Sequence, residues 1–147
     1  MHIPFVYSFQ LGRTLFHHIK ISDIFFGRLS SSHIKFFRIR DANIGFIPDK
    51  TIDAIWSFDV FVHINPDDTD RYLSEFKRVL VRGGIAVIHH PRDGGLHGGC
   101  RSRMTAQLFT GLLEKNGLPL VRQLDSWGEN GRFNLSRYCD CISVFTA

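Results

Sequence analysis

Histidines lie at or near the end of both long apolar runs in the middle of the chain. His63 lies near the end of the run IDAIWSFDVFVHI, and His89 and His90 end the run IAVIHH. A neutral imidazole can accept a proton near pH 7, so all three are predicted as catalytic bases. The alternative for each is a histidine at the end of a strand that bonds only to the backbone.

Metal and nucleophile chemistry have less support in the sequence. His89, His90, His97 and Cys100 lie close together along the chain, but their spacing matches no regular set of metal ligands. The pattern G-x-S-x-G of a serine nucleophile is absent. The three cysteines have no framework spacing. We therefore expect reduced thiols and no metal.

A strand, a helix and a second strand must position the histidines. Both apolar runs are typical of strands that are covered on two faces. Between them, Asn65 can cap a helix, Pro66 suits its first position, and Gly83 can take the left-handed conformation that ends it. The two strands are therefore predicted to be parallel, with Trp56 beside Val87.

The carboxyl ends of the two predicted strands indicate where a ligand is expected. In open parallel sheets, ligands bind in the crevice beyond these ends. The rule points to residues 57–59 after the first strand and to residues 89–92 after the second. Arg101 and Arg103 follow the glycine-rich segment PRDGGLHGG, and they either pair with a carboxylate or phosphate of the ligand or remain solvated.

Short strands are predicted before this central unit. IPFVYSF and LFHHIKI lie within residues 1–32, the least regular part of the chain, and HIKFFRI begins at His33. Residues 41–49 hold an asparagine, a glycine and a proline, so they are predicted as a loop.

A helix and two strands are predicted after the central unit. Thr105 can cap a helix that ends at Asn116 and Gly117. The segments LPLVRQLDSW and YCDCISVF have strand-like composition, and a polar turn from Gly128 to Asn134 joins them. We expect these two strands to form an antiparallel pair that closes one edge of the sheet.

The order of these segments resembles that of class I S-adenosylmethionine-dependent methyltransferases. The resemblance covers residues 33–147, the carboxyl-terminal two thirds of such a domain, and rests on FIPDKTIDAIWSFDVFVHI followed by FKRVLVRGGIAVIHH. It implies that Asp41, after the preceding strand, contacts the adenine of the cofactor with Ala42 beside it. It also implies that Ser57 and Phe58 line the cofactor pocket.

The resemblance implies an α/β fold and a methyltransferase activity. The fold is an incomplete Rossmann-like methyltransferase sheet, with parallel strands, flanking helices and a C-terminal antiparallel strand pair. Residues 1–147 are expected to form a single methyltransferase-like domain in which residues 1–32 are divergent or truncated. The implied reaction is methyl transfer from S-adenosylmethionine to a small-molecule acceptor. Positioning carries most of such a displacement, and only a weakly acidic acceptor needs a base.

The glycine-rich turn that holds the cofactor's methionine part in this family is not visible. Before Asp41 the only glycines are Gly12 and Gly27, which lie far apart. An alternative therefore stays open, in which the chain is a catalytically inactive module that lacks the cofactor-binding half and binds a partner subunit.

Charge and hydropathy argue against other classes of protein. The net charge is +4, and residues 1–40 hold six Lys or Arg and one acid. No nucleic-acid recognition motif accompanies them, so a solvated basic edge is expected. No apolar segment is long enough to span a bilayer and no secretory signal is evident, so we expect no membrane partner and a cytoplasmic location.

Overall fold

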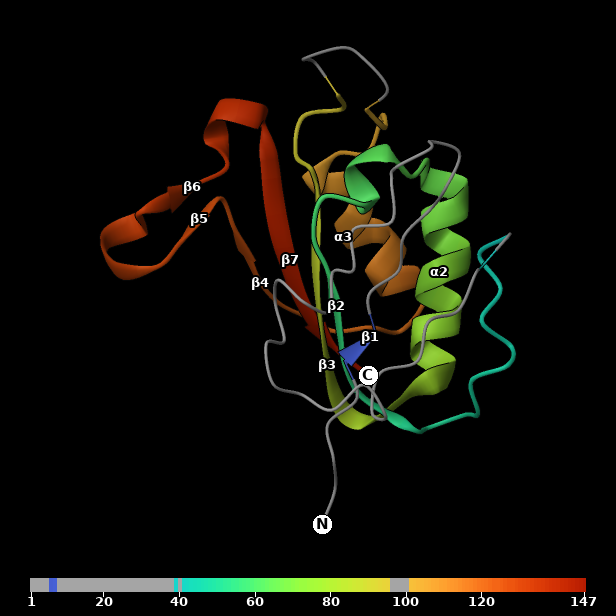
Figure 1. The fold of residues 1–147 in the computed structure, drawn as a ribbon. Coiled ribbons are helices and arrows are strands. Elements are labelled where there is room, and N and C mark those ends of the chain that lie inside the picture. Colours follow the sequence, from blue (N-terminus) through green and yellow to red (C-terminus); the bar gives the residue numbers. More distant parts are fainter. Residues whose placement is uncertain (1–5, 8–38, 40, 96–100) are drawn as a thin grey trace, which may run out of the picture.

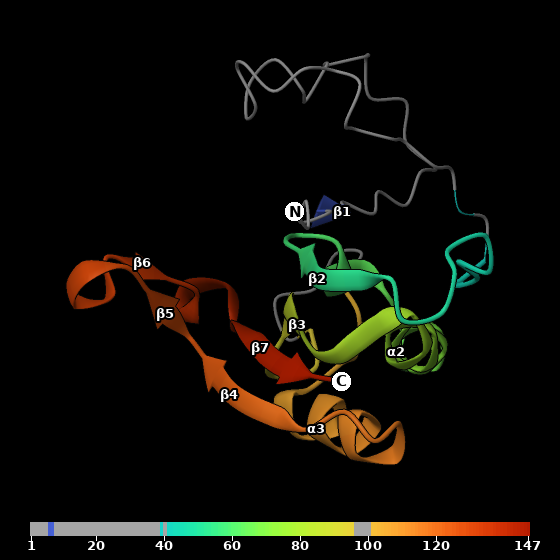
Figure 2. The same ribbon diagram turned by 90° about the horizontal axis from the view of Figure 1, so that it is seen from below.

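A mixed sheet lies at the centre of the computed structural model, which describes residues 6–7, 39, 41–95 and 101–147. Its strands are β1 (Val6–Tyr7), β2 (Ile52–Ser57), β3 (Leu80–Pro91), β4 (Leu120–Leu124) and β7 (Asp140–Thr146). Their order across the sheet is β1-β2-β3-β7-β4 (Figure 1). The helices α2 (Pro66–Val79) and α3 (Ala106–Lys115) lie against one face of this sheet (Figure 2).

The directions of the strands confirm the predicted α/β sheet. β1, β2 and β3 are parallel, and Trp56 lies opposite Val87 as expected. β7 is antiparallel to both β3 and β4, so the carboxyl-terminal pair is also confirmed. Of the strands predicted near the amino terminus, IPFVYSF contains β1, whereas LFHHIKI and residues 33–38 lie outside the described residues.

The first central strand is shorter than predicted. β2 ends at Ser57, and the chain turns at Asp59, whose φ is 58°. The 3-10 helix η2 (Phe61–His63) follows and buries Phe61 and Val62. One long strand was predicted because burial alone does not distinguish a strand from a buried turn.

Helix α2 begins where the sequence predicts but ends earlier. Asn65 precedes it, and Pro66 is its first residue, where a missing N–H costs no hydrogen bond. The prediction that Gly83 ends the helix is wrong, because Leu80 already begins β3 opposite Ile52. Gly83 does have a left-handed backbone, with φ of 78°, but within the strand. Burial of Leu80 in the sheet outweighs the local helical pattern.

Helix α3 confirms the predicted signals at both of its ends. The Thr105 side chain accepts a hydrogen bond from the backbone N–H of Leu108 at 3.0 Å. Asn116 follows the last helical residue. Gly117 has a φ of 64°, the left-handed conformation that commonly follows a helix.

The connection between β4 and β7 contains more structure than the predicted polar turn. The strands β5 (Ser126–Trp127) and β6 (Phe133–Asn134) pair antiparallel in a small separate hairpin. In Figures 1 and 2 this hairpin projects beyond β4 and β7. The rings of Trp127 and Phe133 stack across it, with centroids 5.4 Å apart.

Apolar side chains fill the space between the sheet and its two helices. The largest are fully buried: Phe61, Phe76, Phe109 and Phe145. The opposite face carries a smaller cluster of Leu135, Ile142 and Val144, with Val87, Leu124 and Trp127 partly buried against it. On that face, Trp56 and Ile85 remain 48% and 41% exposed. The two described helices thus cover one face only.

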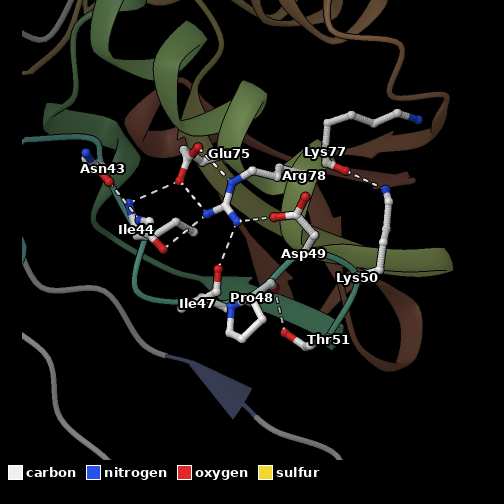
Figure 3. Close-up of polar contacts among 11 residues, drawn as sticks. Asn43, Ile44, Ile47, Pro48, Asp49, Lys50, Thr51, Glu75, Lys77 and Arg78 are labelled. Carbon is white, nitrogen blue, oxygen red and sulfur yellow. Dashed lines mark hydrogen bonds and ion pairs between the residues drawn. The ribbon is translucent and has the colours of Figure 1, made fainter.

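The Arg78 side chain of helix α2 forms hydrogen bonds to the loop before β2 (Figure 3). Its guanidinium donates to Asp49 Oδ1 at 2.6 Å and to Glu75 Oε2 at 2.8 Å. It also donates to the carbonyl oxygens of Ile44 and Ile47 at 3.2 Å and 2.8 Å. Glu75 in turn accepts from the N–H of Ile44 at 3.2 Å. One side chain therefore links two acids and two backbone carbonyls.

Replacing Arg78 with methionine is expected to lower the free energy of unfolding by about 2 kcal/mol, because several charge-assisted hydrogen bonds are lost together. Urea denaturation followed by circular dichroism measures the change. Arg71→Met is the matched control, since among the described residues Arg71 forms an ion pair with the exposed Asp68 at 3.5 Å, and its loss should cost less than about 0.5 kcal/mol. Equal losses in the two variants would contradict the role of Arg78.

Candidate functional site

The carboxyl ends of β2 and β3 bring predicted residues from both strands together. Ser57, the last residue of β2, lies opposite Ile88 of β3. The residues that follow, Phe58 and His89, stack with ring centroids 4.3 Å apart and ring planes at 21°. The sheet therefore forms one continuous edge from the turn after β2 to the end of β3.

Ser57 and Phe58 contribute a hydroxyl group and an aromatic ring to this edge. Ser57 is 3% exposed, and its Oγ has no hydrogen-bond partner within the described residues. A buried hydroxyl without a partner is costly, so it is a candidate contact for a polar atom of a ligand. Phe58 is 39% exposed and presents an aromatic ring beside it.

His89 is buried, and both of its ring nitrogens face other groups. Nδ1 accepts a hydrogen bond from the backbone N–H of Asp59 at 3.0 Å. Nε2 lies 3.2 Å from Asp140 Oδ2, with a geometry poorer than that of a hydrogen bond. Because a backbone N–H can only donate, Nδ1 carries no proton, and the neutral ring has its proton on Nε2 facing Asp140.

Asp140 and Arg101 complete the surroundings of His89. The Asp140 side chain is 3% exposed, and its other oxygen, Oδ1, forms an ion pair with Arg101. Burial lowers the pKa of His89, and the nearby Asp140 opposes this shift. His89 is therefore neutral at pH 7 and held between a backbone N–H and a buried carboxylate.

His90 has the contacts of a core histidine, to a backbone carbonyl and to a side-chain hydroxyl. Nδ1 donates to the carbonyl oxygen of Pro91 at 2.9 Å, and Nε2 accepts from Ser143 Oγ at 2.7 Å. The ring stacks on Phe109 with centroids 3.9 Å apart. Burial lowers the pKa of His90 to about 4. The imidazole has no exposed surface from which it could reach an acceptor.

His63 is the last residue of η2 and is the one exposed member of the three predicted bases. It follows β2 by six residues, so it lies after the same strand as Ser57 and Phe58. Among the three histidines, it is the one placed to meet a ligand from solvent.

Asp41 and Ala42 lie beside helix α2. Asp41 is exposed, whereas Ala42 is 8% exposed and belongs to the main core. Both line an open depression of about 540 Å³, with Asn43, Asp70, Arg71, Ser74, Glu75, Lys115 and Asn116. Neither Ser57 nor Phe58 contributes to this lining. The two pairs of predicted cofactor residues therefore line different surfaces in this structure.

Sequence reasoning missed the part of the site that Asp140 provides. Arg101 was expected to pair with an acidic group of the ligand or to remain solvated, but it pairs with Asp140. The available signal was an acid in the apolar segment YCDCISVF, because carboxylates are seldom fully buried without a partner. A single sequence does not show which distant residue that partner is.

An aromatic row extends the site toward the β5–β6 hairpin, which the sequence did not predict. Phe58 meets Trp127 edge to face, with centroids 5.7 Å apart, and it stacks near Trp56 at 6.2 Å. Phe133 continues the row through its stack with Trp127. Because Phe58 and Phe133 are 39% and 48% exposed, the row provides apolar contact area next to the edge.

The part of the chain that the structure describes contains no cluster of metal ligands and no disulfide. No group of three or more His, Cys, Asp or Glu side chains in that part is placed to hold a metal, and His97 and Cys100 lie outside it. Cys139 and Cys141 form no disulfide, and burial raises the pKa of Cys141 to about 12. Within the same residues, no helix combines the length and apolar character needed to cross a membrane.

Sequence comparison agrees with the resemblance. A family model described as a methyltransferase domain matches residues 16–88, which include β2, α2 and most of β3. No curated protein matches the chain. The match and the fold confirm the resemblance to class I S-adenosylmethionine-dependent methyltransferases stated above.

Solved structures share this fold at low sequence identity. A Galdieria sulphuraria protein assigned as a sarcosine dimethylglycine methyltransferase has a TM-score of 0.60 at 17% identity, over 79% of this chain and 60% of its own. The Haloferax volcanii protein in complex with the Trm112 methyltransferase activator has a TM-score of 0.57 at 15% identity, over 76% and 61%.

A TehB-like SAM-dependent methyltransferase from Corynebacterium glutamicum ATCC 13032 Kitasato has a TM-score of 0.54 at 23% identity, over 74% of this chain and 54% of its own. These identities show a common fold and no more. The chain spans between half and two thirds of the length of the three structures.

Proposed function

We propose that the chain transfers a methyl group from S-adenosylmethionine to a small-molecule acceptor at the carboxyl edge of β2 and β3. One observation carries the proposal: the buried Ser57 hydroxyl, which has no hydrogen-bond partner among the described residues, lies next to the exposed Phe58 ring, at the edge where open parallel sheets bind ligands. This pair suits a cofactor that combines polar groups with an aromatic base. The bound cofactor supplies a methyl group already activated by its sulfonium.

The proposal gives each residue of this edge a distinct task. Ser57 bonds to a polar group of the cofactor, and Phe58 contacts its adenine. His63, exposed after the same strand, accepts a proton where the acceptor must lose one. His90 receives no catalytic task because it is enclosed, and His89 is considered separately below. The depression beside Asp41 and Ala42 is the competing location for the adenine.

A non-catalytic module is the second candidate function. It is favoured by the absence of closely spaced glycines before Asp41. The Haloferax volcanii protein is in complex with a methyltransferase activator. The corresponding proposal for this chain is a partner subunit that the methyltransferase-like fold binds.

Calorimetric titration with S-adenosylhomocysteine, the product of the cofactor, distinguishes the two functions. The enzyme is expected to bind it with a dissociation constant in the micromolar range, or about −8 kcal/mol. Absence of heat at millimolar ligand would favour the module.

Replacing Phe58 with alanine is expected to weaken the binding of S-adenosylhomocysteine about tenfold, because an aromatic contact with the adenine is lost. The same titration measures this change. Phe46→Ala is the control, since Phe46 is 48% exposed but lies in the loop before β2. If Phe46→Ala weakens binding and Phe58→Ala does not, the cofactor lies near the loop and not at the edge.

A further inference from the structure

We propose that His89 is a positioning residue for the turn that follows β2, and that Asp140 and Arg101 fix its ring for this task. The inference rests on the proposed function, because this turn carries Phe58 to the proposed cofactor site. The contact between His89 and this turn is present in the structure without a ligand.

The turn after β2 contains a residue with positive φ whose backbone N–H finds its partner on the neighbouring strand. Asp59 has a φ of 58°, in the left-handed region that side chains other than glycine seldom adopt. Its backbone N–H is satisfied by His89 Nδ1, which lies on the neighbouring strand β3. His89 also supports the turn through the stack of its ring on Phe58, at 4.3 Å. Two consecutive residues of the turn, Phe58 and Asp59, therefore contact the same imidazole ring.

Asp140 and Arg101 determine which nitrogen of His89 carries the proton. Asp140 Oδ2 faces Nε2 at 3.2 Å, so the carboxylate favours a proton on that nitrogen. Arg101 pairs with the other oxygen and compensates the buried negative charge. With the proton on Nε2, Nδ1 keeps the lone pair that accepts the Asp59 N–H.

Protonation of His89 is expected to release the turn. Among the described residues, the charged groups that face the ring are Asp59 from the turn after β2, Arg101 from the segment before α3 and Asp140 from β7, while His90 is its chain neighbour. A second proton, on Nδ1, would turn this nitrogen into a donor. Two donors would then face each other, so the hydrogen bond from the Asp59 N–H would be lost. The contact is therefore present at neutral pH and is lost as pH falls through the pKa of His89.

Hydrogen exchange of the Asp59 amide, followed by NMR, tests the proposal without a ligand. His89→Leu removes the acceptor and is expected to speed this exchange about tenfold. His89→Asn places an amide oxygen where Nδ1 stands, so it should restore slow exchange. The asparagine does not titrate, so protection of its Asp59 amide, measured relative to the intrinsic exchange rate at each pH, should not fall with acid as it does in the wild-type protein.

Controls separate this effect from general loosening of the fold. The amide of Val87 in β3 should exchange at the wild-type rate in both His89 variants. Arg103→Leu should leave the Asp59 amide unchanged, because Arg103 is exposed, whereas Arg101→Leu should speed its exchange. Unchanged exchange of the Asp59 amide in a folded His89→Leu variant would overturn the proposal. If that variant does not fold, an identical pH profile in His89→Asn and the wild type would overturn it.

Titration of the same variants with S-adenosylhomocysteine distinguishes this inference from the proposed function. His89→Leu should weaken binding, and His89→Asn should restore it. If the wild-type protein binds no ligand, the proposed function fails, while the exchange experiment still decides whether His89 holds the turn. If the turn loosens and ligand affinity stays constant, the positioning task is overturned.

Discussion

Truncation of Phe109 to alanine is expected to lower the free energy of unfolding by about 3–5 kcal/mol, among the largest losses of any single substitution in the chain. Phe109 is fully buried in α3. Its ring stacks on His90 at 3.9 Å and meets Phe145 at 6.2 Å, so it joins the helix to β3 and β7. The alanine variant would leave a cavity between the helix and the sheet.

Chemical denaturation with urea, followed by circular dichroism and intrinsic fluorescence, measures this loss. Leu108→Ala is the matched control, because Leu108 precedes Phe109 in the same helix and is 40% exposed. It is expected to cost less than about 1 kcal/mol. Similar losses in both variants would mean that α3 does not pack on the sheet through Phe109.

Acid is expected to destabilise the protein strongly through His90. Its pKa is about 4 in the folded protein, against 6.5 for an unperturbed histidine, because burial disfavours the charged ring. The unfolded chain therefore binds a proton first as pH falls below 6.5. The contribution of neutral His90 to the free energy of unfolding is fully present above pH 6.5 and is lost as pH falls from 6.5 to 4. Linkage gives a loss of about 3 kcal/mol over that window.

Urea denaturation at a series of pH values from 7.5 to 4 checks this dependence, and His90→Asn is the variant to compare. The variant is expected to be less stable at pH 7.5, because its amide cannot reproduce the stack on Phe109. Its stability should fall less steeply with acid than that of the wild type. Parallel curves for the two proteins would show that His90 is not the source of the acid sensitivity.

Local patterns predicted the central part of the fold because several independent signals agreed there. Asn65 and Pro66 mark the start of α2, although the Asn65 side chain makes no capping hydrogen bond, and the Thr105 side chain caps α3 as predicted. The parallel pairing of Trp56 with Val87 followed from the order of strand, helix and strand. Each of these signals depends on residues that are near in sequence.

The missed features depend on contacts between distant segments. Leu80 ends α2 early because it pairs with Ile52, and Arg101 meets Asp140 from a segment 39 residues away. The β5–β6 hairpin was also missed, because Trp127 and Phe133 flank a stretch whose polar composition suggested only a turn. Asp41 and Ala42 were assigned by resemblance, and the structure places them beside α2, in a lining without Ser57.

The location of bound S-adenosylhomocysteine decides whether the carboxyl edge of β2 and β3 is the cofactor site. Backbone amide shifts of the ¹⁵N-labelled protein, recorded during titration with S-adenosylhomocysteine, report where the ligand lies. We expect the largest changes at Ser57, Phe58 and Asp59, with smaller ones at His89. Changes confined to Asp41, Ala42 and the neighbouring residues of α2, or no changes at millimolar ligand, would contradict this prediction.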